Sequence, residues 1–160
     1  MKNKEKSYSI KSILINDYAS FASWVFPTVI FIMALFIEVF GFFPDLKRGR
    51  APLTTEAIPF FIQFGIIVLI IGLVIISLRV VRFKKFFENG IEVEGEVTDL
   101  WKYRDRGRIY FTFTYKDLKC DNSNSVHFNN GTKRFLPHTK VRILFKRENY
   151  FKAIIKDLFV

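Results

Sequence analysis

Two long apolar runs occupy residues 21–43 and 58–78, in the first half of the 160-residue chain. The second run contains no ionisable residue, and the first contains only Glu38. A helix that is apolar on every side belongs in lipid or in a large core, and a chain of this length cannot bury two such helices. Each run reaches the roughly 20 residues that a helix needs to cross a bilayer. The pattern predicts a membrane α-helical hairpin.

The segments around the two runs complete this predicted hairpin. Residues 1–20 form a basic flank that ends in a short interfacial helix, because apolar side chains recur there at helical spacing. Residues 44–57 predict an external loop that reverses the chain. The second helix is predicted to continue past residue 78 to about residue 89, since Gly90 is the first natural stop. Val80, Phe83 and Phe87 on this extension are expected to pack on the domain that follows.

Residues 90–160 alternate between polar and apolar positions and predict a small all-β domain, a five- or six-stranded antiparallel barrel or sandwich. Gly95 falls on an inward-facing row and predicts a bulge or a sharp bend. Residues 125–135, centred on Asn130-Gly131, predict a tight hairpin. The rows expected to face inward are Ile91, Val93 and Val97, then Ile109, Phe111, Phe113 and Tyr115, and finally Val141, Ile143 and Phe145.

Charge predicts the orientation of the hairpin. The net charge is +10, and residues 1–87 carry eleven Lys and Arg against five Asp and Glu. Eight basic residues lie in the two outer flanks and three in the connecting loop. Basic flanks stay in the cytoplasm. The expected location is therefore the cell inner (cytoplasmic) membrane, as a multi-pass protein with both termini cytoplasmic.

The sequence contains few of the residues that form disulfides, metal sites or catalytic sites. The lone Cys120 cannot form an intrachain disulfide, and His127 and His138 without a cysteine pair cannot build a structural zinc site. Asn130 fits a glycosylation sequon, but the Asn-Gly turn is the favoured interpretation. No nucleophile-elbow, phosphate-loop or metal spacing occurs. We therefore expect no catalytic, cofactor-binding or metal-binding residue and no enzyme activity.

The chain resembles a family of uncharacterised bacterial membrane proteins, grouped as a domain of unknown function. The matching stretches are residues 90–98, 108–116 and 139–154, and the resemblance covers about half of the chain. Members of that family combine one or two membrane helices with a short β domain. The resemblance therefore implies the same architecture, and the family has no established activity to transfer.

Glu38 is the one ionisable residue inside an apolar run, and an intramembrane carboxylate is a functional hypothesis by default. The structural alternative is favoured, because Glu38 lies near the end of its run and can pair with Lys47, Arg48 or Arg50. On the first helix Ala34, Glu38 and Gly41 share a face. On the second, either Gln63 or the face of Gly65 and Gly72 is turned toward the first helix, and the sequence leaves this choice open.

Two patterns in the β domain invite a functional interpretation. Residues 106–113 interleave arginines with aromatics, which suits nucleic-acid binding, but alternation turns Phe111 and Phe113 inward and favours a core strand. Glu92, Glu94 and Glu96 suggest a cation site, but they are expected to form a solvated face opposite basic residues of another strand. The basic residues of that face are Lys140, Arg142 and Lys146.

These observations predict a non-enzymatic inner-membrane protein that presents a small cytoplasmic β module for protein–protein interaction. The expected partners are the lipid bilayer and an unidentified protein, with a homo-oligomer as one form of such contact, and no nucleic acid. The alternative is a small membrane accessory protein, an immunity or transport-associated factor, that acts through its transmembrane hairpin.

Overall fold

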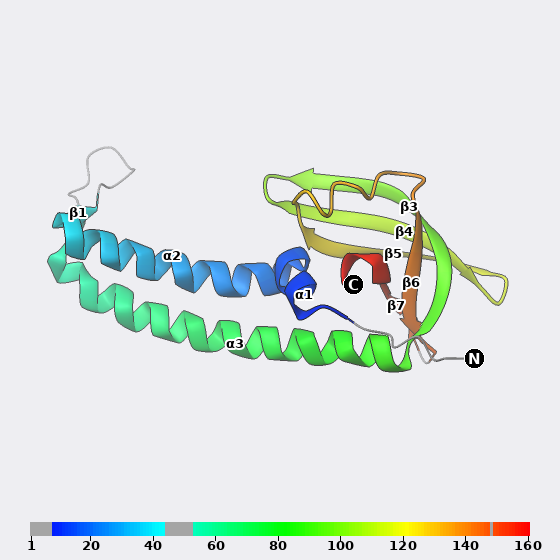
Figure 1. Cartoon of the computed structure of the whole chain (residues 1–160), viewed down its shortest axis with the longest axis horizontal. Helices are drawn as coiled ribbons and strands as arrows, with labels where there is room; N and C mark the ends of the chain where they lie inside the picture. The colour runs from blue at the N-terminus through cyan, green and yellow to red at the C-terminus, as the bar shows by residue number, and fades with distance from the viewer. Residues whose placement is uncertain (1–7, 44–52, 148) are drawn as a thin grey trace. The chain divides into compact units, whose positions relative to one another are not determined.

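The computed structural model describes residues 8–43, 53–147 and 149–160, and it divides into two units. One unit holds the N-terminal part of the chain up to Phe21 together with Ile76–Val160. The other unit is Ala22–Ile75. Figure 1 labels the elements of both. Two parts of the predicted fold class are confirmed, namely two long apolar helices and a small β domain, which is a nearly closed five-stranded antiparallel barrel-like sheet.

The hairpin unit contains most of α2 (Tyr18–Phe40) and the first part of α3 (Ile58–Asn89), and both helices are long and apolar enough to cross a membrane. Gly41 follows α2 with a φ of 77°. Then β1 (Phe42–Phe43) pairs with β2 (Leu53–Thr54), and the 3-10 turn η1 (Thr55–Ala57) leads into α3. Within the apolar windows only 22% of the α2 positions and 11% of the α3 positions are buried. Such exposed apolar surface is what lipid would cover.

The two helices approach each other closely at glycines. A Cβ atom on Gly72 would lie 2.2 Å from the Ser23 carbonyl oxygen, and one on Gly65 would lie 2.9 Å from the Phe31 ring. Gln63 is exposed. The choice that the sequence left open is therefore resolved in favour of the glycine face.

The face predicted for the first helix is wrong in part. Ala34 and Ile37 are buried at 6% and 0% exposure, whereas Glu38 is exposed. Residues three apart lie on the same face of a helix, so Ala34 and Ile37 share the buried face, and Glu38 lies next to that face. Lys47, Arg48 and Arg50, its predicted partners, lie outside the described residues.

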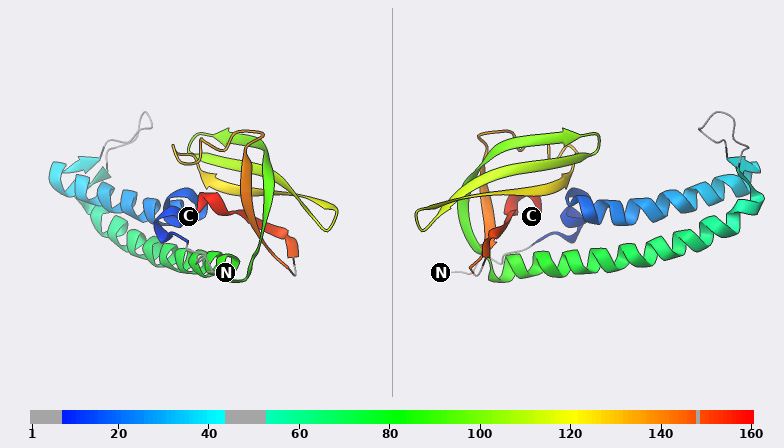
Figure 2. Two further views of the ribbon diagram at one scale, coloured as in Figure 1. Left: turned by 45° about the vertical axis from the view of Figure 1, so that its right-hand side comes forward. Right: turned by 180° about the vertical axis from the view of Figure 1, so that it is seen from behind.

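The other unit contains the short helix α1 (Ile10–Asn16), the far end of α3, and five strands in the order β5-β4-β3-β6-β7. All neighbouring strands are antiparallel. The barrel form is thus observed, and Figure 2 shows how strongly the sheet curls between its two edges. The strands are β3 (Ile91–Tyr103), β4 (Arg106–Tyr115), β5 (Leu118–His127), β6 (Lys140–Lys146) and β7 (Asn149–Ile155), followed by the 3-10 turn η2 (Lys156–Leu158).

Gly95 lies where β3 passes from one neighbouring strand to the other. It is paired with Phe113 on one side and Val141 on the other, so β3 joins both halves of the sheet there. A Cβ atom on Gly95 would lie 2.3 Å from Ile143 Cδ1 and 2.5 Å from the Thr112 carbonyl oxygen. A side chain would not fit at Gly95, and the irregularity in the β3–β4 register lies further along, between Val97 and Asp99.

Helical side chains fill the barrel. Phe83, Phe86 and Phe87 of α3 are at most 3% exposed and share one core with the strands, as does Ile13 of α1. The predicted packing of α3 is confirmed for Phe83 and Phe87, while Val80 is only partly buried. Asn89 ends the helix and Gly90 follows, as predicted. The strand residues of this core that are fully or almost fully buried include Val97, Ile109, Phe111, Phe113, Val141, Ile143 and Phe145, all from the predicted inward rows.

The predicted interfacial helix also packs on this unit. The buried apolar face of α1 is smaller than predicted, because Ile13 is buried in the core whereas Ile10 is 53% exposed. Ser9 caps the helix through a side-chain hydrogen bond from the Ser12 amide, at 3.2 Å. Protein contact, rather than a broad apolar face, thus holds α1 in place.

The hairpin predicted at residues 125–135 is wrong. His127 ends β5, and residues 129–134 form turns rather than a returning strand. Thr132 is fully buried, its hydroxyl donates to the His127 carbonyl at 3.0 Å, and the Asn129 carboxamide oxygen accepts from the Gly131 amide at 2.8 Å. Side-chain hydrogen bonds of this kind compete with the strand ladder and win here.

Candidate functional site

A buried ion pair lies where α1 gives way to α2. Asp17 follows α1 and stands three residues before Ser20, whose amide and hydroxyl both donate to Asp17 Oδ2, at 2.9 and 2.8 Å. This is the geometry of an N-cap on α2. Arg79 of α3 donates from Nε to Oδ2 at 2.9 Å and from Nη2 to Oδ1. The Asp17 side chain is 2% exposed and that of Arg79 is 25% exposed.

The β domain holds this junction through several polar contacts. Asp17 and Val126 of β5 form an isolated antiparallel bridge. His127 Nδ1 lies 3.1 Å from the Ile15 carbonyl oxygen, and the Asn129 carboxamide donates to Asn16 Oδ1 at 3.0 Å. The turn that was mistaken for a hairpin thus fixes the chain at the start of α2.

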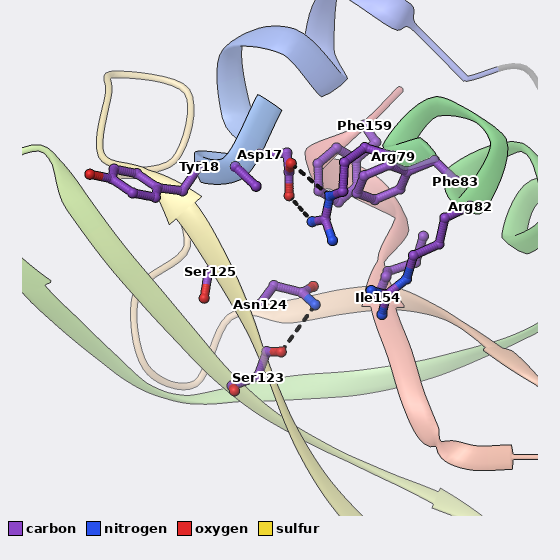
Figure 3. A pocket seen from close by; sticks show the side chains of 11 residues that line it. Asp17, Tyr18, Arg79, Arg82, Phe83, Ser123, Asn124, Ser125, Ile154 and Phe159 are labelled. Carbon is purple, nitrogen blue, oxygen red and sulfur yellow. Dashed lines mark hydrogen bonds and ion pairs between the residues drawn. The ribbon is translucent and has the colours of Figure 1, made fainter. Parts of the chain in front are cut away.

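A polar cleft of about 380 Å³ opens beside this ion pair. Figure 3 shows Arg79 turned toward Asp17, whereas Arg82 extends away from the pair. The cleft is lined by the α1–α2 junction, by α3, by β5 residues 123–125, and by Ile154 and Phe159. We call it the arginine cleft.

Charge in the arginine cleft does not balance. Its lining residues include two arginines and one carboxylate, Asp17, whose oxygens already accept from Ser20 and Arg79. Arg82 makes no ion pair with any residue of the described ranges; its guanidinium lies 5.9 Å from the centre of the Phe86 ring. Burial, and then the charge of Arg79, lower the pKa of Arg82, which Asp17 opposes. The cleft therefore carries an excess positive charge.

A second hollow, of about 310 Å³, lies beside the turn of the β3–β4 hairpin. Trp101 and Tyr103 are 47% and 58% exposed, and their rings stack 6.2 Å apart. The strand register places Trp101 opposite Arg108 and Tyr103 opposite Arg106. We call Trp101, Tyr103, Arg104, Arg106, Arg108 and Tyr110 the aromatic–arginine surface.

Arginines of this surface are held against aromatic rings. Arg106 lies 4.4 Å from the centre of the Tyr18 ring, and Arg104 lies 5.4 Å from that of Tyr103. Phe111 and Phe113 of the same segment are 0% and 2% exposed, so they face inward as the alternation predicted. The two phenylalanines that nucleic-acid stacking would require are thus core residues.

Two of the three residues in the acidic row on β3 face basic residues, as expected, whereas Glu92 is opposite Leu144. Glu94 is opposite Arg142, and Glu96 is opposite Lys140. The ion pairs go elsewhere: Glu92 binds Lys156 at 2.7 Å, and Glu96 Oε1 lies 2.7 Å from Nδ1 of His138.

Arg142 of the facing strand binds Asp157 instead of Glu94. Its Nε donates to Asp157 Oδ1 at 2.7 Å, and this hydrogen bond raises the pKa of Arg142. Within the described residues no cluster of three His, Cys, Asp or Glu side chains is placed to hold a metal ion.

Sequence reasoning missed the arginine cleft, and of the aromatic–arginine surface it singled out only the part within residues 106–113, not Trp101 and Tyr103. Asp17 and Arg79 are 62 residues apart, and no spacing rule pairs them. The usable signals were local: Asp17 is the last charged residue before the first apolar run, and Arg79 is the first charged residue after the second run. The helical spacing of residues 9–18 places Asp17 on the polar face of the predicted interfacial helix and indicates no partner for it.

No protein-family model matches the chain, and neither a curated protein nor a solved structure does so. The resemblance to the family of uncharacterised membrane proteins therefore stays a prediction.

Proposed function

We propose that this chain is a non-enzymatic protein of the cytoplasmic (inner) membrane, which spans the membrane twice and keeps both termini in the cytoplasm. Its barrel unit presents the aromatic–arginine surface to an acidic segment of a partner protein. The two apolar helices with mostly exposed surfaces support the membrane anchor.

The single observation that carries the proposal is the exposed Trp101–Tyr103 stack opposite Arg106 and Arg108. Trp, Tyr and Arg are the residues enriched at the energetic centres of protein interfaces. The rings are rigid, and cation–π contacts hold Arg104 and Arg106, so little side-chain entropy is lost on binding.

Charge indicates the kind of partner. The hairpin residues 101–108 contain four basic side chains and one acid, Asp105. A net positive surface of this kind attracts acidic segments and disfavours basic ones. Carboxylates accept bidentate hydrogen bonds from arginine, which adds geometric selectivity.

A photo-crosslinking experiment in intact cells tests this contact. The photoreactive residue p-benzoylphenylalanine replaces Tyr103 in the full chain, and a matched probe replaces Phe151, which is 70% exposed on β7. We expect a discrete protein adduct from the Tyr103 position, with an acidic crosslinked peptide, and its loss when Arg106→Gln and Arg108→Gln are combined. Adducts only to lipid, only to a second copy, or equally from both positions contradict the proposal.

Orientation has its own test. A green fluorescent protein fused to the C-terminus fluoresces only if that end is cytoplasmic, whereas alkaline phosphatase at the same place is active only outside. We expect fluorescence and no phosphatase activity, with the protein in the membrane pellet after alkaline carbonate extraction. The opposite reporter pattern, or release by carbonate, contradicts the proposed topology or anchor.

The alternative, a small accessory protein that acts through its hairpin, rests on one observation. Glu38 is exposed on α2 within an apolar run, where a carboxylate is costly unless it serves a purpose. Glu38→Gln separates the two ideas. If Glu38→Gln fails to complement a deletion strain although the Tyr103 crosslink is intact, the alternative is favoured. If Glu38→Gln complements the deletion but the crosslink-deficient variant Arg106→Gln/Arg108→Gln does not, the barrel surface is favoured.

A further inference from the structure

We propose that the arginine cleft binds a phosphate group, and that Arg82 is its principal ligand. The proposal rests on the membrane location proposed above, because that location makes phospholipid headgroups the most abundant source of such a group. A free phosphate compound shares the same chemistry, and the experiment below distinguishes the two sources.

The first argument is the unbalanced charge. Arg79 is neutralised by Asp17, with which it shares two hydrogen bonds, so Arg82 supplies the net positive charge of the cleft. A guanidinium group that has no carboxylate of its own beside a cleft favours an anion there. A guanidinium donates two parallel hydrogen bonds to phosphate, which a lysine ammonium group cannot match.

The second argument is the composition of the wall. The cleft combines polar atoms of residues 123–125 with the apolar side chains of Phe83, Ile154 and Phe159. Its volume of about 380 Å³ lies within the range of small-molecule sites. A phosphate that carries a short apolar or glycerol-like group matches such a wall better than a bare ion does.

The third argument is position along the chain. Arg82 stands four residues after Leu78, the last residue of the apolar run, which is about 6 Å of helix. Tyr18 and Ala19, which also line the cleft, lie just before the other apolar run. Lipid phosphates occupy this boundary between hydrocarbon and water, where basic side chains meet anionic headgroups.

The test uses the full chain purified in a neutral detergent. Native mass spectrometry measures binding of phosphatidylglycerol, with phosphatidylcholine as the zwitterionic comparison. The variant is Arg82→Gln, and the matched control is Lys85→Gln, which removes the same charge from an exposed position of α3 that does not line the cleft. Arg82→Lys keeps the charge but not the paired donors.

We expect Arg82→Gln to weaken phosphatidylglycerol binding at least tenfold, Lys85→Gln less than threefold, and Arg82→Lys by an intermediate factor. Thermal unfolding of each variant is measured alongside, and if Arg82→Gln unfolds, Arg82→Lys against Lys85→Gln carries the comparison. Equal effects of the Arg82 and Lys85 changes, or equal binding of both lipids by the wild type, overturn the headgroup site.

Binding of inorganic phosphate tests the second source, a free phosphate compound. If millimolar phosphate alone raises the unfolding temperature of the wild type but not of Arg82→Gln, while phosphatidylglycerol binds no better than phosphatidylcholine, the phosphate site stands and its source is a free compound. If neither phosphate nor phosphatidylglycerol depends on Arg82, the proposal is wrong.

Failure of this proposal is distinguishable from failure of the proposed function. Membrane anchoring is measured by carbonate extraction, and the protein contact by the crosslink from position 103. Arg82→Gln is expected to leave both unchanged, because Arg82 lines neither the aromatic–arginine surface nor the hollow beside it.

Discussion

Replacing Arg79 by Gln leaves the Asp17 carboxylate buried without its counter-charge. The carboxylate is 2% exposed, and the two hydrogen bonds from Ser20 are the contacts that remain. Removing one partner of a buried ion pair costs about 3–5 kcal/mol. The 25% exposure of Arg79 means that water partly reaches the pair, so we expect the lower end, about 3 kcal/mol.

A double-mutant cycle makes this reasoning testable. Asp17→Asn keeps an oxygen for the Ser20 amide but removes the charge, so the double variant Asp17→Asn/Arg79→Gln contains no uncompensated buried ion. We expect the double variant to be more stable than Arg79→Gln alone, with a coupling of 1 kcal/mol or more, about the size typical of residues in one buried network.

Thermal unfolding of the detergent-solubilised full chain, followed by circular dichroism, provides the measurement. A loss of 3 kcal/mol corresponds to a fall in Tm of about 6–12 °C for a chain of this size. A fall of less than 2 °C for Arg79→Gln, or a double variant as unstable as the sum of the single changes, would show that the ion pair does not hold the junction.

Three further changes have expected outcomes. At Gly72 even a Cβ atom would lie 2.2 Å from the Ser23 carbonyl oxygen, so in Gly72→Val the two helices must separate and we expect the protease resistance of the hairpin to fall. In Gly131→Ala the added Cβ atom would have no contact under 3.1 Å, so we expect only a mild effect on protease resistance. Phe86→Ala empties a position of 1% exposure in the barrel and is expected to cost about 3–5 kcal/mol in chemical denaturation. Asn124→Ala removes hydrogen bonds to the Ile155 amide at 2.8 Å and the Ala153 carbonyl oxygen at 3.2 Å, and should speed amide hydrogen exchange of β7 more than of β4.

Alternation along the chain predicted which side chains form the barrel core. Ile109, Phe111 and Phe113 are buried as expected, because a strand in a one-sided sheet must turn every second residue inward. The stop at Gly90 was equally local: its amide bonds to the Phe86 carbonyl oxygen at 2.9 Å, and a Cβ there would lie 2.2 Å from the same oxygen. Patterns of neighbours along the chain are sufficient for such features.

The features that could not be predicted depend on residues distant in sequence. The turn at Asn129 looked like a hairpin because Asn-Gly favours one, but contacts to Ile15 and Asn16 decide its conformation. The sheet closes in a similar way. β5 and β7 are its two edges, and Asn122 and Asn124 donate across the gap to the Phe151 and Ala153 carbonyl oxygens. The polar side chains of β5 do not indicate in the sequence that this strand contacts β7 and closes the sheet.

The barrel cannot be separated from the helices that precede it. Its core contains Phe83, Phe86 and Phe87 from α3 and Ile13 from α1, all at most 3% exposed. Burying one such side chain contributes about 1.5–3 kcal/mol, so the three phenylalanines together contribute about 5–9 kcal/mol, comparable with the 5–15 kcal/mol that separates most native domains from their unfolded chains. The five strands without residues 8–21 and 76–89 therefore lack the means to stay folded, and these helical residues belong to the same unit as the strands.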